Sequence, residues 1–347
     1  MESQFTIQQA ISQIVSGVHL ERAEAKLVMA GIMEGNATPA QIASLVTALR
    51  MKGETSEEIT GFAESMRSKS DRVITDNTNL LDTCGTGGDG SDTFNISTAS
   101  ALVAAAGGIR VAKHGNRAMS SKSGSADVLE ALGVNIQLNG EQAAQCLAQV
   151  GICFMFAQQF HQSMKHAAVP RREIGIRTIF NLLGPLTNPA GADHQLLGIF
   201  DRTKTELIAK VMHELNVKRG LVVASLDGLD EISIAAATQV TELKNGVIKT
   251  YQIVPDDLGL RISDISNLKG GDAQTNAEII RAIFQGELGA RRDVILANAG
   301  ACFYVAGRCG TLQEGVKLAG SIIDSGKANT KLADLVRCTG ELSHVSR

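Results

Sequence analysis

Aromatic residues are scarce in this chain of 347 residues, which has no Trp, two Tyr and ten Phe. Proteins that bind single-stranded nucleic acid without sequence preference stack bases on aromatic side chains, so this composition disfavours that class. An excess of one charge is also missing, because 33 Lys and Arg face 36 Asp and Glu and leave a net charge of −3. Nucleic-acid binders and membrane-surface binders usually carry a positive excess, and we therefore expect neither nucleic acid nor a membrane as a partner.

Long hydrophobic runs are absent as well. The run of lowest polarity, residues 99–108, consists of small side chains and is far shorter than the ~20 residues that cross a bilayer. The first residues, Met1 to Gln4, show neither the basic start nor the apolar stretch of an export signal. We therefore expect no membrane span and a cytoplasmic location.

The cysteines show no pattern of a metal site or of a disulfide framework. No Cys-x-x-Cys pair and no companion histidines at zinc spacing occur among Cys84, Cys146, Cys153, Cys302, Cys309 and Cys338. We expect reduced thiols, most of them in the core.

The first seventy or so residues have the pattern of helices in series. Apolar residues recur at i, i+3, i+4 and i+7 within residues 42–49 and again within 59–66, which predicts one buried stripe on each helix. Thr55 with Glu58 has the spacing of a capping box at the start of the second helix. We predict a small helical domain over residues 1–72.

From residue 73 onward, short apolar segments alternate with polar ones. Segments typical of buried strands or helices lie at residues 80–81, 99–106, 109–112, 126–132, 152–156 and 221–223. Residues 239–253 have the pattern of a hairpin, and helix returns from about residue 276 to 337. We predict an α/β domain with a central mixed sheet over residues 73–347, with part of 165–190 completing the helical domain.

Glycine, by contrast, is abundant at 35 residues, and several of these glycines lie in one loop. Residues 82–90 read DTCGTGGDG and contain the spacing of the dinucleotide fingerprint GxGxxG. That fingerprint needs a helix at the loop and an acidic residue about 20 positions on, and a P-loop needs a closing Gly-Lys-Ser/Thr; these features are missing here. The loop instead predicts backbone N–H groups that cradle phosphate, with Asp89 facing a bridging cation or a sugar hydroxyl.

Further donor groups follow the glycine loop. Residues 95–98 at a predicted helix start, residues 113–117 after a strand and residues 120–125 in a Ser/Gly run offer hydroxyl, N–H and cationic groups for phosphate. Three arginines border a later helical face, namely Arg171, Arg172 and Arg177. Asp230 and Glu231 follow a buried strand, and adjacent carboxylates suit a hard cation such as Mg²⁺. Successive strand ends are where open α/β sheets bind ligands.

In this order and spacing, the motifs GTGGDG, NIST, KHGNR, SSKSGSADVLEALG, RTIFNLLGPLTNP and DGLDE resemble the anthranilate phosphoribosyltransferase family. The likeness extends from about residue 5 to residue 340. It implies a fold like that of nucleoside phosphorylases and phosphoribosyltransferases, with a small N-terminal helical domain on a larger α/β domain, and a homodimer. It also implies transfer of phosphoribose from phosphoribosyl pyrophosphate (PRPP) to the amine of anthranilate in tryptophan biosynthesis, with two Mg²⁺ ions per subunit.

The resemblance also implies site residues. PRPP would be held by Gly85, Gly88, Asp89, Thr93, Asn95, Ile96, Ser97, Thr98, Lys113, His114, Gly115, Asn116, Arg117, Ala118, Met119, Ser120, Ser121 and Ser125. Anthranilate would contact Gly85, Asn116 and Arg171, and Mg²⁺ would be ligated by Ser97, Asp230 and Glu231. No side chain is expected to act as general acid or base, because the amine is already a nucleophile, and His114 is interpreted as a positioning residue.

The chain differs from the common family pattern at a few positions. Gln162 and Ser163 stand where Pro-Ala is common, Ala224 stands where a His often follows the strand, and residues 234–237 lack the usual hydroxyls. The PRPP motifs themselves are unchanged, so the differences concern the acceptor and the surroundings of the metal.

Two alternatives remain beside the transferase. A pyrimidine nucleoside phosphorylase-like enzyme shares the implied fold, but it binds inorganic phosphate and has less need of paired carboxylates for a metal. A non-catalytic relative that binds nucleic acid is disfavoured by the net charge of −3. Association with an anthranilate synthase subunit is left open.

Overall fold

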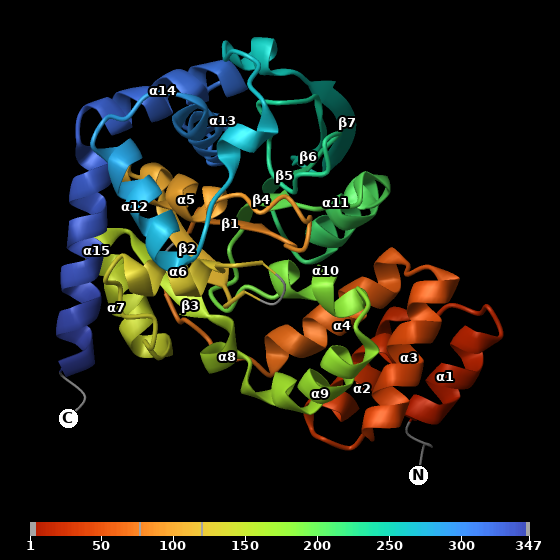
Figure 1. Ribbon diagram of the computed structural model, residues 1–347. Helices are drawn as coiled ribbons and strands as arrows, with labels where there is room; N and C mark the ends of the chain where they lie inside the picture. Colours follow the sequence, from red (N-terminus) through yellow and green to blue (C-terminus); the bar gives the residue numbers. More distant parts are fainter. Residues whose placement is uncertain (1–4, 76–77, 119–120, 345–347) are drawn as a thin grey trace.

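The computed structural model describes residues 5–75, 78–118 and 121–344. A group of helices at the N-terminus lies beside a larger α/β part (Figure 1). The first four helices are α1 (Ile7–Val15), α2 (Arg22–Met33), α3 (Pro39–Lys52) and α4 (Ser56–Ser68). Two later helices, α9 (Lys165–Ile174) and α10 (Ile179–Leu186), pack against α3 and α4.

Side-chain caps account for the starts of these N-terminal helices. Thr55 Oγ1 accepts from the Glu58 N–H and Glu58 accepts from the Thr55 N–H, which confirms the predicted capping box of α4. The Glu58 carboxylate is fully buried, accepts from the Leu20 N–H at 2.9 Å and pairs with Lys52 Nζ at 2.9 Å. A single carboxylate therefore joins α4 to α3 and to the loop between α1 and α2.

The central sheet is mixed, as predicted, with the strand order β3-β2-β1-β4-β5-β6-β7. The strands are β1 (Leu80–Gly85), β2 (Arg110–Gly115), β3 (Ile152–Phe156), β4 (His194–Gly198), β5 (Arg219–Ser225), β6 (Thr238–Lys244) and β7 (Val247–Ile253). Strands β1 to β5 pair in parallel, and β6 and β7 form the predicted antiparallel hairpin. The chain winds outward in both directions from β1 and β4, and α/β sheets bind ligands at such a switch point.

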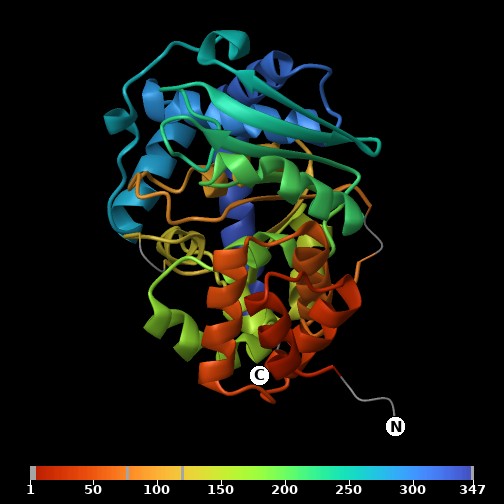
Figure 2. The same ribbon diagram turned by 90° about the vertical axis from the view of Figure 1, so that its right-hand side faces the viewer.

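The sheet separates two hydrophobic cores, because successive strand residues point to opposite faces. Leu196 and Val223 face the core that contains α5 (Ile96–Ala106) and α13 (Ala290–Val305). Leu197 and Val222 face the core that contains α11 (Thr205–Glu214) and the N-terminal helices. Figure 2, viewed from the side of these helices, shows α11 between them and the β6–β7 hairpin.

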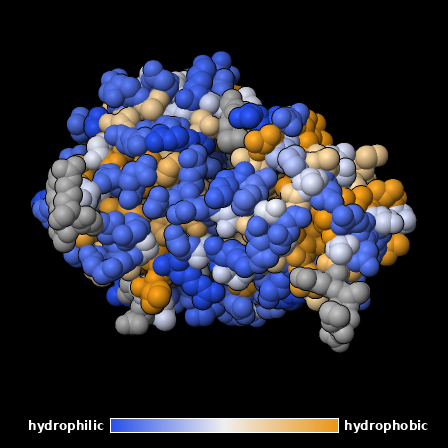
Figure 3. Space-filling view, turned by 90° about the horizontal axis from the view of Figure 1, so that it is seen from below, coloured by the Kyte–Doolittle hydropathy of each residue, from blue (hydrophilic) through white to orange (hydrophobic). Residues whose placement is uncertain are grey.

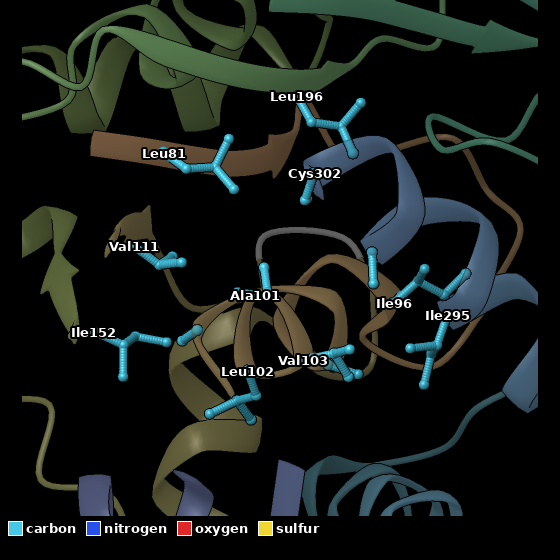
Figure 4. Close-up of a cluster of buried hydrophobic side chains, with 14 of the residues drawn as sticks. Leu81, Ile96, Ala101, Leu102, Val103, Val111, Ile152, Leu196, Ile295 and Cys302 are labelled. Atoms are coloured by element: carbon cyan, nitrogen blue, oxygen red, sulfur yellow. The ribbon is translucent and has the colours of Figure 1, made fainter. Parts of the chain in front are cut away.

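Helix α5 contains most of the low-polarity run at residues 99–108. Ala101 and Val103 are buried, and the close-up in Figure 4 shows Ala101 on the side of α5 that faces Leu81 of β1, with Ile295 and Cys302 of α13 beside the helix. The approach is close: a Cβ on Gly107, just after the helix, would lie 2.3 Å from the Phe303 ring of α13. Small side chains therefore let α5 fit tightly against its neighbours, and this packing sets the position of its N-terminus at the edge of the sheet.

The remaining helices pack into the core that contains α5 and α13. They are α6 (Ser125–Ala131), α7 (Gly140–Val150), α8 (Ala157–Phe160), α12 (Ala273–Phe284), α14 (Leu312–Asp324) and α15 (Lys327–His344), with 3₁₀ helices at Gln162–Met164, Arg202–Lys204, Pro255–Leu258 and Ile265–Leu268. In the part of the chain that the structure describes, no helix has the length and apolar character needed to span a membrane. All six cysteines are free thiols, five of them buried, as predicted.

Candidate active site

The glycine loop follows β1 and turns through left-handed backbone conformations. Gly87, Gly88 and Gly90 have φ values of 67°, 71° and 77°, which residues with a Cβ rarely adopt. The Ser91 N–H donates to Asp89 Oδ1 at 3.2 Å and so holds this carboxylate within the loop. A turn of this kind exposes successive backbone N–H groups and suits an anion.

The acidic pair Asp230-Glu231 lies against this loop at the same edge of the sheet. The two residues are only 8% and 7% exposed, and the Gly87 N–H donates to Asp230 Oδ2 at 2.7 Å. A Cβ on Gly85 of β1 would lie 2.3 Å from Asp230 Oδ2, and a Cβ on Gly198 of β4 would lie 1.5 Å from the Asp230 carbonyl oxygen. Glycine at both strand ends is therefore needed for the acidic pair to reach this position.

Both carboxylates have raised pKa values. Burial, followed by the charge of Asp89, raises the pKa of Asp230 to about 7, and burial with the charge of Asp230 raises the pKa of Glu231 well above its usual range. The charge of Arg177 lowers the pKa of Asp230, and the charge of Lys113 lowers that of Glu231, but neither cancels the effect of burial. A divalent cation fits here, because it would take the place of the protons and stabilise the ionised forms.

The number of acidic ligands indicates what kind of metal site this is. Within residues 5–75, 78–118 and 121–344, no group of three or more His, Cys, Asp or Glu side chains is placed to hold an ion by itself. Mg²⁺ typically binds through one or two carboxylates and takes its other ligands from phosphate and water. The Asp230-Glu231 pair has the composition of such a site.

Lys113 and Ser97 bring two further predicted residues to the pair. Lys113 is 2% exposed, and its Nζ donates to the Thr83 carbonyl and, at 3.4 Å, to Ser97 Oγ. A hydrogen bond from the Ser97 backbone N–H favours the charged form of Glu231. Side chains from β2, the start of α5 and the turn after β5 therefore meet at one point.

Asn95 has its side chain fully engaged beside this point. Its Oδ1 accepts from Asn276 Nδ2 at 2.9 Å and Ser123 Oγ at 3.3 Å, and its Nδ2 donates to the Ser123 carbonyl at 3.1 Å. Asn276, in the first turn of α12, is a residue that the sequence patterns did not single out. The Asn95 side chain thus ties the Ser/Gly segment to α5, and its predicted contact with PRPP stays a prediction.

Arg117 is engaged with carboxylates of the following segment. Its Nη1 lies 2.9 Å from Asp127 Oδ1 and 2.5 Å from Glu130 Oε2. Asp127 also accepts from the Gly124 N–H at 2.8 Å, so the pair closes the loop between β2 and α6. Direct phosphate contact by the Arg117 guanidinium stays a prediction. Two other assigned residues, Met119 and Ser120, lie outside the described residues.

Arg171 lies in the last turn of α9. Its guanidinium is 5.1 Å from the centroid of the Phe180 ring, and burial lowers its pKa. Within the part of the chain that the structure describes, no carboxylate is paired with it. A partly buried cation in this state suits a ligand carboxylate, which a guanidinium can bind through two hydrogen bonds.

His114 and His161 form a buried pair whose ring centroids are 5.0 Å apart. Burial lowers the pKa of His114 well below its usual value and the pKa of His161 to about 4. His161 Nε2 lies 3.0 Å from the Thr187 carbonyl, whereas His114 Nε2 has no partner among the described residues. Such a weakly basic, enclosed imidazole is a poor general base at neutral pH, which favours a positioning role for His114.

Arg177 was noted in the sequence without a role, and the structure brings it to the glycine loop. Its guanidinium stacks 4.0 Å from the Phe200 ring centroid, and a Cβ on Gly88 would lie 3.3 Å from its Nε. Its charge also lowers the pKa of Asp230. The basic residue itself was visible in the motif RTIFN, but nothing in its spacing indicated contact with a loop nearly ninety residues away.

The sequence patterns also did not indicate a buried polar contact between Asn188 and the strands β1 and β2. Asn188 Nδ2 donates to Asp82 Oδ2 and to the Ala112 carbonyl, both at 2.8 Å, and Asp82 Oδ1 accepts from the His114 N–H. Burial raises the pKa of Asp82. This contact fastens β1 to β2 directly beneath the two loops that follow them.

The departures from the common pattern fall at different depths. Ala224 and Ile234 are buried in the cores, where apolar side chains pack well, and Gln162 is exposed. The turn just before Ile234 has the hydroxyl of Ser233, whose Oγ donates to Asp227 Oδ2 at 2.7 Å. These substitutions leave the acidic pair in place.

Comparisons with known proteins identify the family of the chain. Residues 8–70 match the helical bundle domain of the glycosyl transferase family, and residues 77–329 match its a/b domain. The chain is 54% identical to an anthranilate phosphoribosyltransferase of Brevibacillus brevis, over 97% of this chain and 99% of the relative. The crystal structure of the anthranilate phosphoribosyltransferase of Thermus thermophilus superposes with a TM-score of 0.91 at 42% identity, covering 95% of this chain and 99% of that one. The Saccharomyces cerevisiae enzyme in complex with PRPP and Mg gives 0.89 at 26% identity, covering 96% and 98%. The chain therefore belongs to the anthranilate phosphoribosyltransferase family.

Proposed function

We propose that the chain transfers the phosphoribosyl group of PRPP to the amine of anthranilate, giving N-(5-phosphoribosyl)anthranilate and pyrophosphate, as a cytoplasmic enzyme of tryptophan biosynthesis. The observation that carries the proposal is the buried Asp230-Glu231 pair, which has raised pKa values and lies against a loop of backbone donors. A substrate that brings both phosphate and Mg²⁺ satisfies both features together. The names of the relatives support the choice of reaction over a phosphorylase or a non-catalytic binder.

The residues support catalysis by position and charge. The C1–O bond of PRPP breaks with its electron pair going to pyrophosphate, while the anthranilate nitrogen forms the C1–N bond on the opposite face and then loses a proton to solvent. Glycine-loop N–H groups, the α5 N-terminus and Lys113 stabilise the charge that grows on the leaving group. Mg²⁺, when bound, neutralises part of that charge.

The residue roles belong to the same proposal. We assign Ser97, Asp230 and Glu231 to Mg²⁺, with two ions per subunit, and Gly85, Asn116 and Arg171 to anthranilate. PRPP is assigned to the residues from Gly85 to Ser125 that the family resemblance implies. Ser97 contacts both of the other groups on that side of the site, because its hydroxyl accepts from Lys113 Nζ and its N–H donates to Glu231, which supports assigning them to one site.

The first experiment follows the loss of anthranilate fluorescence on addition of PRPP to the purified protein, with and without Mg²⁺. We expect a decay that needs both. If PRPP binds by calorimetry but no decay occurs, the acceptor is a different amine. Phosphorolysis of thymidine or uridine, with no decay of anthranilate fluorescence, would favour the phosphorylase instead.

The substitution Arg171→Ala tests the anthranilate assignment. We expect the KM for anthranilate to rise by ~10- to 100-fold, because a charged hydrogen-bonded contact contributes about 1.5–3 kcal/mol, while the KM for PRPP changes little. Steady-state kinetics with each substrate varied in turn measures the split. Arg172→Ala, the exposed neighbour on the same turn, is the matched control. Equal effects on both KM values would contradict the assignment.

We propose in addition that the protein is a homodimer that associates through its N-terminal helices. Val15 at the end of α1 is 71% exposed and Met51 of α3 is 84% exposed, and Figure 3 shows hydrophobic side chains gathered on this side of the molecule. Contiguous apolar surface of this kind is typical of an interface. Light scattering after gel filtration should give a dimer mass for the wild type and a monomer mass for Val15→Glu/Met51→Glu. Leu288→Glu, at an equally exposed position before α13, should remain dimeric.

A further inference from the structure

Asn298 is a fully buried polar residue in the middle of α13, and it contacts the turn that carries the acidic pair. Its Oδ1 accepts from the Ile232 N–H at 3.0 Å, and its Nδ2 donates to the Ile232 carbonyl at 2.9 Å. The second Nδ2 hydrogen bond goes to the Val294 carbonyl, also at 2.9 Å, one turn earlier in the helix. The carboxamide thus pairs with both backbone groups of Ile232 as a neighbouring strand would.

These two bonds act directly on the residue before Ile232. The Ile232 N–H belongs to the peptide group that joins it to Glu231, so holding this N–H fixes the plane of that peptide and the ψ angle of Glu231. The Asp230 carbonyl on the other side packs against Gly198 of β4. The backbone of the acidic pair is therefore held from both ends, by β4 before it and by α13 after it.

Helix α13 is itself well fixed in the fold. A Cβ on Gly300 would lie 2.6 Å from the Val316 nitrogen, and a Cβ on Gly315 would lie 2.2 Å from the Gly300 carbonyl, so α13 and α14 cross in close contact. Helix α13 also packs along α5, whose first turn contains Ser97. The same helix therefore relates the position of Glu231 to that of Ser97, although neither residue belongs to it.

We propose that Asn298 is a positioning residue for the Mg²⁺ site: its hydrogen bonds to Ile232 hold Glu231 in the orientation in which it and Asp230 receive the Mg²⁺ that accompanies PRPP. The inference rests on the proposed function, because it concerns the residues assigned there to Mg²⁺. Asn298 does not touch substrate and acts through the backbone of its neighbour in space. Groups that orient metal ligands in this way affect metal affinity strongly when they are replaced.

Asn298→Ser is the informative variant, because a serine hydroxyl in a helix can still bond to the Val294 carbonyl four residues earlier, whereas it is too short to pair with Ile232. Calorimetric titration with PRPP in the presence of Mg²⁺ should show a Kd raised ~10-fold or more, and the Mg²⁺ concentration for half-maximal PRPP binding should rise as well. The KM for anthranilate should stay within about twofold. Asn298→Leu, which also removes the bond to Val294, should give the same shift if it folds.

Thr339→Val is the control for a loss of buried hydrogen bonding alone. Thr339 of α15 is 1% exposed, and its hydroxyl bonds to the Asn135 N–H and the Leu335 carbonyl, away from the acidic pair. It should lower thermal stability while leaving PRPP binding unchanged. The proposal is overturned if Asn298→Ser loses stability to a similar degree but binds PRPP and Mg²⁺ like the wild type. If the wild-type protein itself binds no PRPP with Mg²⁺, the proposed function is what has failed.

Discussion

Replacing both acidic residues, as Asp230→Asn with Glu231→Gln, is expected to lower the kcat/KM of the proposed Mg²⁺-dependent transfer by ~10³-fold or more, because we assign this pair to hold the cation that would stabilise the charge developing on the leaving group. Residual turnover should no longer respond to Mg²⁺. The fluorescence decay of anthranilate, recorded over a Mg²⁺ titration, measures both effects. A metal titration identical to that of the wild type would refute the role of the pair.

The same double variant should be more stable than the wild type when Mg²⁺ is removed by a chelator. Burial and the charge of Asp89 raise the pKa of Asp230 to about 7, and burial and the charge of Asp230 raise the pKa of Glu231 well above its usual range, so the native state holds their protons more tightly than the unfolded chain does. Wild-type stability should therefore fall as pH rises from about 4, the unfolded carboxyl pKa, through about 7, while the amide variant lacks this loss. Midpoints of thermal unfolding at pH 4 and pH 8 test the sign.

Added Mg²⁺ should raise the midpoint of the wild type at pH 8 and leave that of the double variant unchanged, since a ligand stabilises only the protein that binds it. Asp256→Asn, an exposed carboxylate in the 3₁₀ helix Pro255–Leu258, is the control for a change of net charge. If the double variant is less stable than the wild type at pH 8 without metal, ionisation of the buried pair does not destabilise the native state, and the prediction is wrong.

Among the Gly→Ala substitutions in this chain, Gly198→Ala should destabilise the protein most. Its Cβ would lie 1.5 Å from the carbonyl oxygen of Asp230. The position of a Cβ is fixed by its own backbone and the oxygen is a backbone atom, so no side-chain rotation relieves the overlap. Either β4 or the turn after β5 must move. We expect a loss of ~3 kcal/mol or more in the free energy of unfolding, at the upper end for overpacking. Urea unfolding with calorimetry of PRPP binding measures the loss of stability and the displacement of the acidic pair.

Gly340→Ala is the matched control, because Gly340 lies in α15 and a Cβ added there would meet nothing within 4 Å. Helix propensity predicts that this substitution stabilises the protein by roughly 0.5–1 kcal/mol. Similar unfolding curves for the two variants would mean that the contact between Gly198 and Asp230 is loose enough to yield.

The features that were predicted well depend on residues close together in the chain. The capping box of Thr55 and Glu58 and the hairpin at residues 239–253 follow from local spacing, and both are present. The first strand was predicted only at residues 80–81 because polar residues follow, yet β1 continues to Gly85. Asp82 can remain in a buried strand because Asn188, 106 residues away, donates to its carboxylate, and no local pattern contains that information.

The sequence by itself determined the chemical groups at the candidate site: a glycine-rich loop, the hydroxyl, N–H and cationic groups of residues 95–98 and 113–117, and a pair of adjacent carboxylates. Tertiary structure alone decided which residues surround them. It placed Gly198 against Asp230, stacked Arg177 beside Gly88 and paired Asn298 with Ile232. Local motifs are visible in sequence because neighbours in the chain must be neighbours in space, whereas these contacts arise from strand register and helix packing, which bring distant residues together without any repeated spacing.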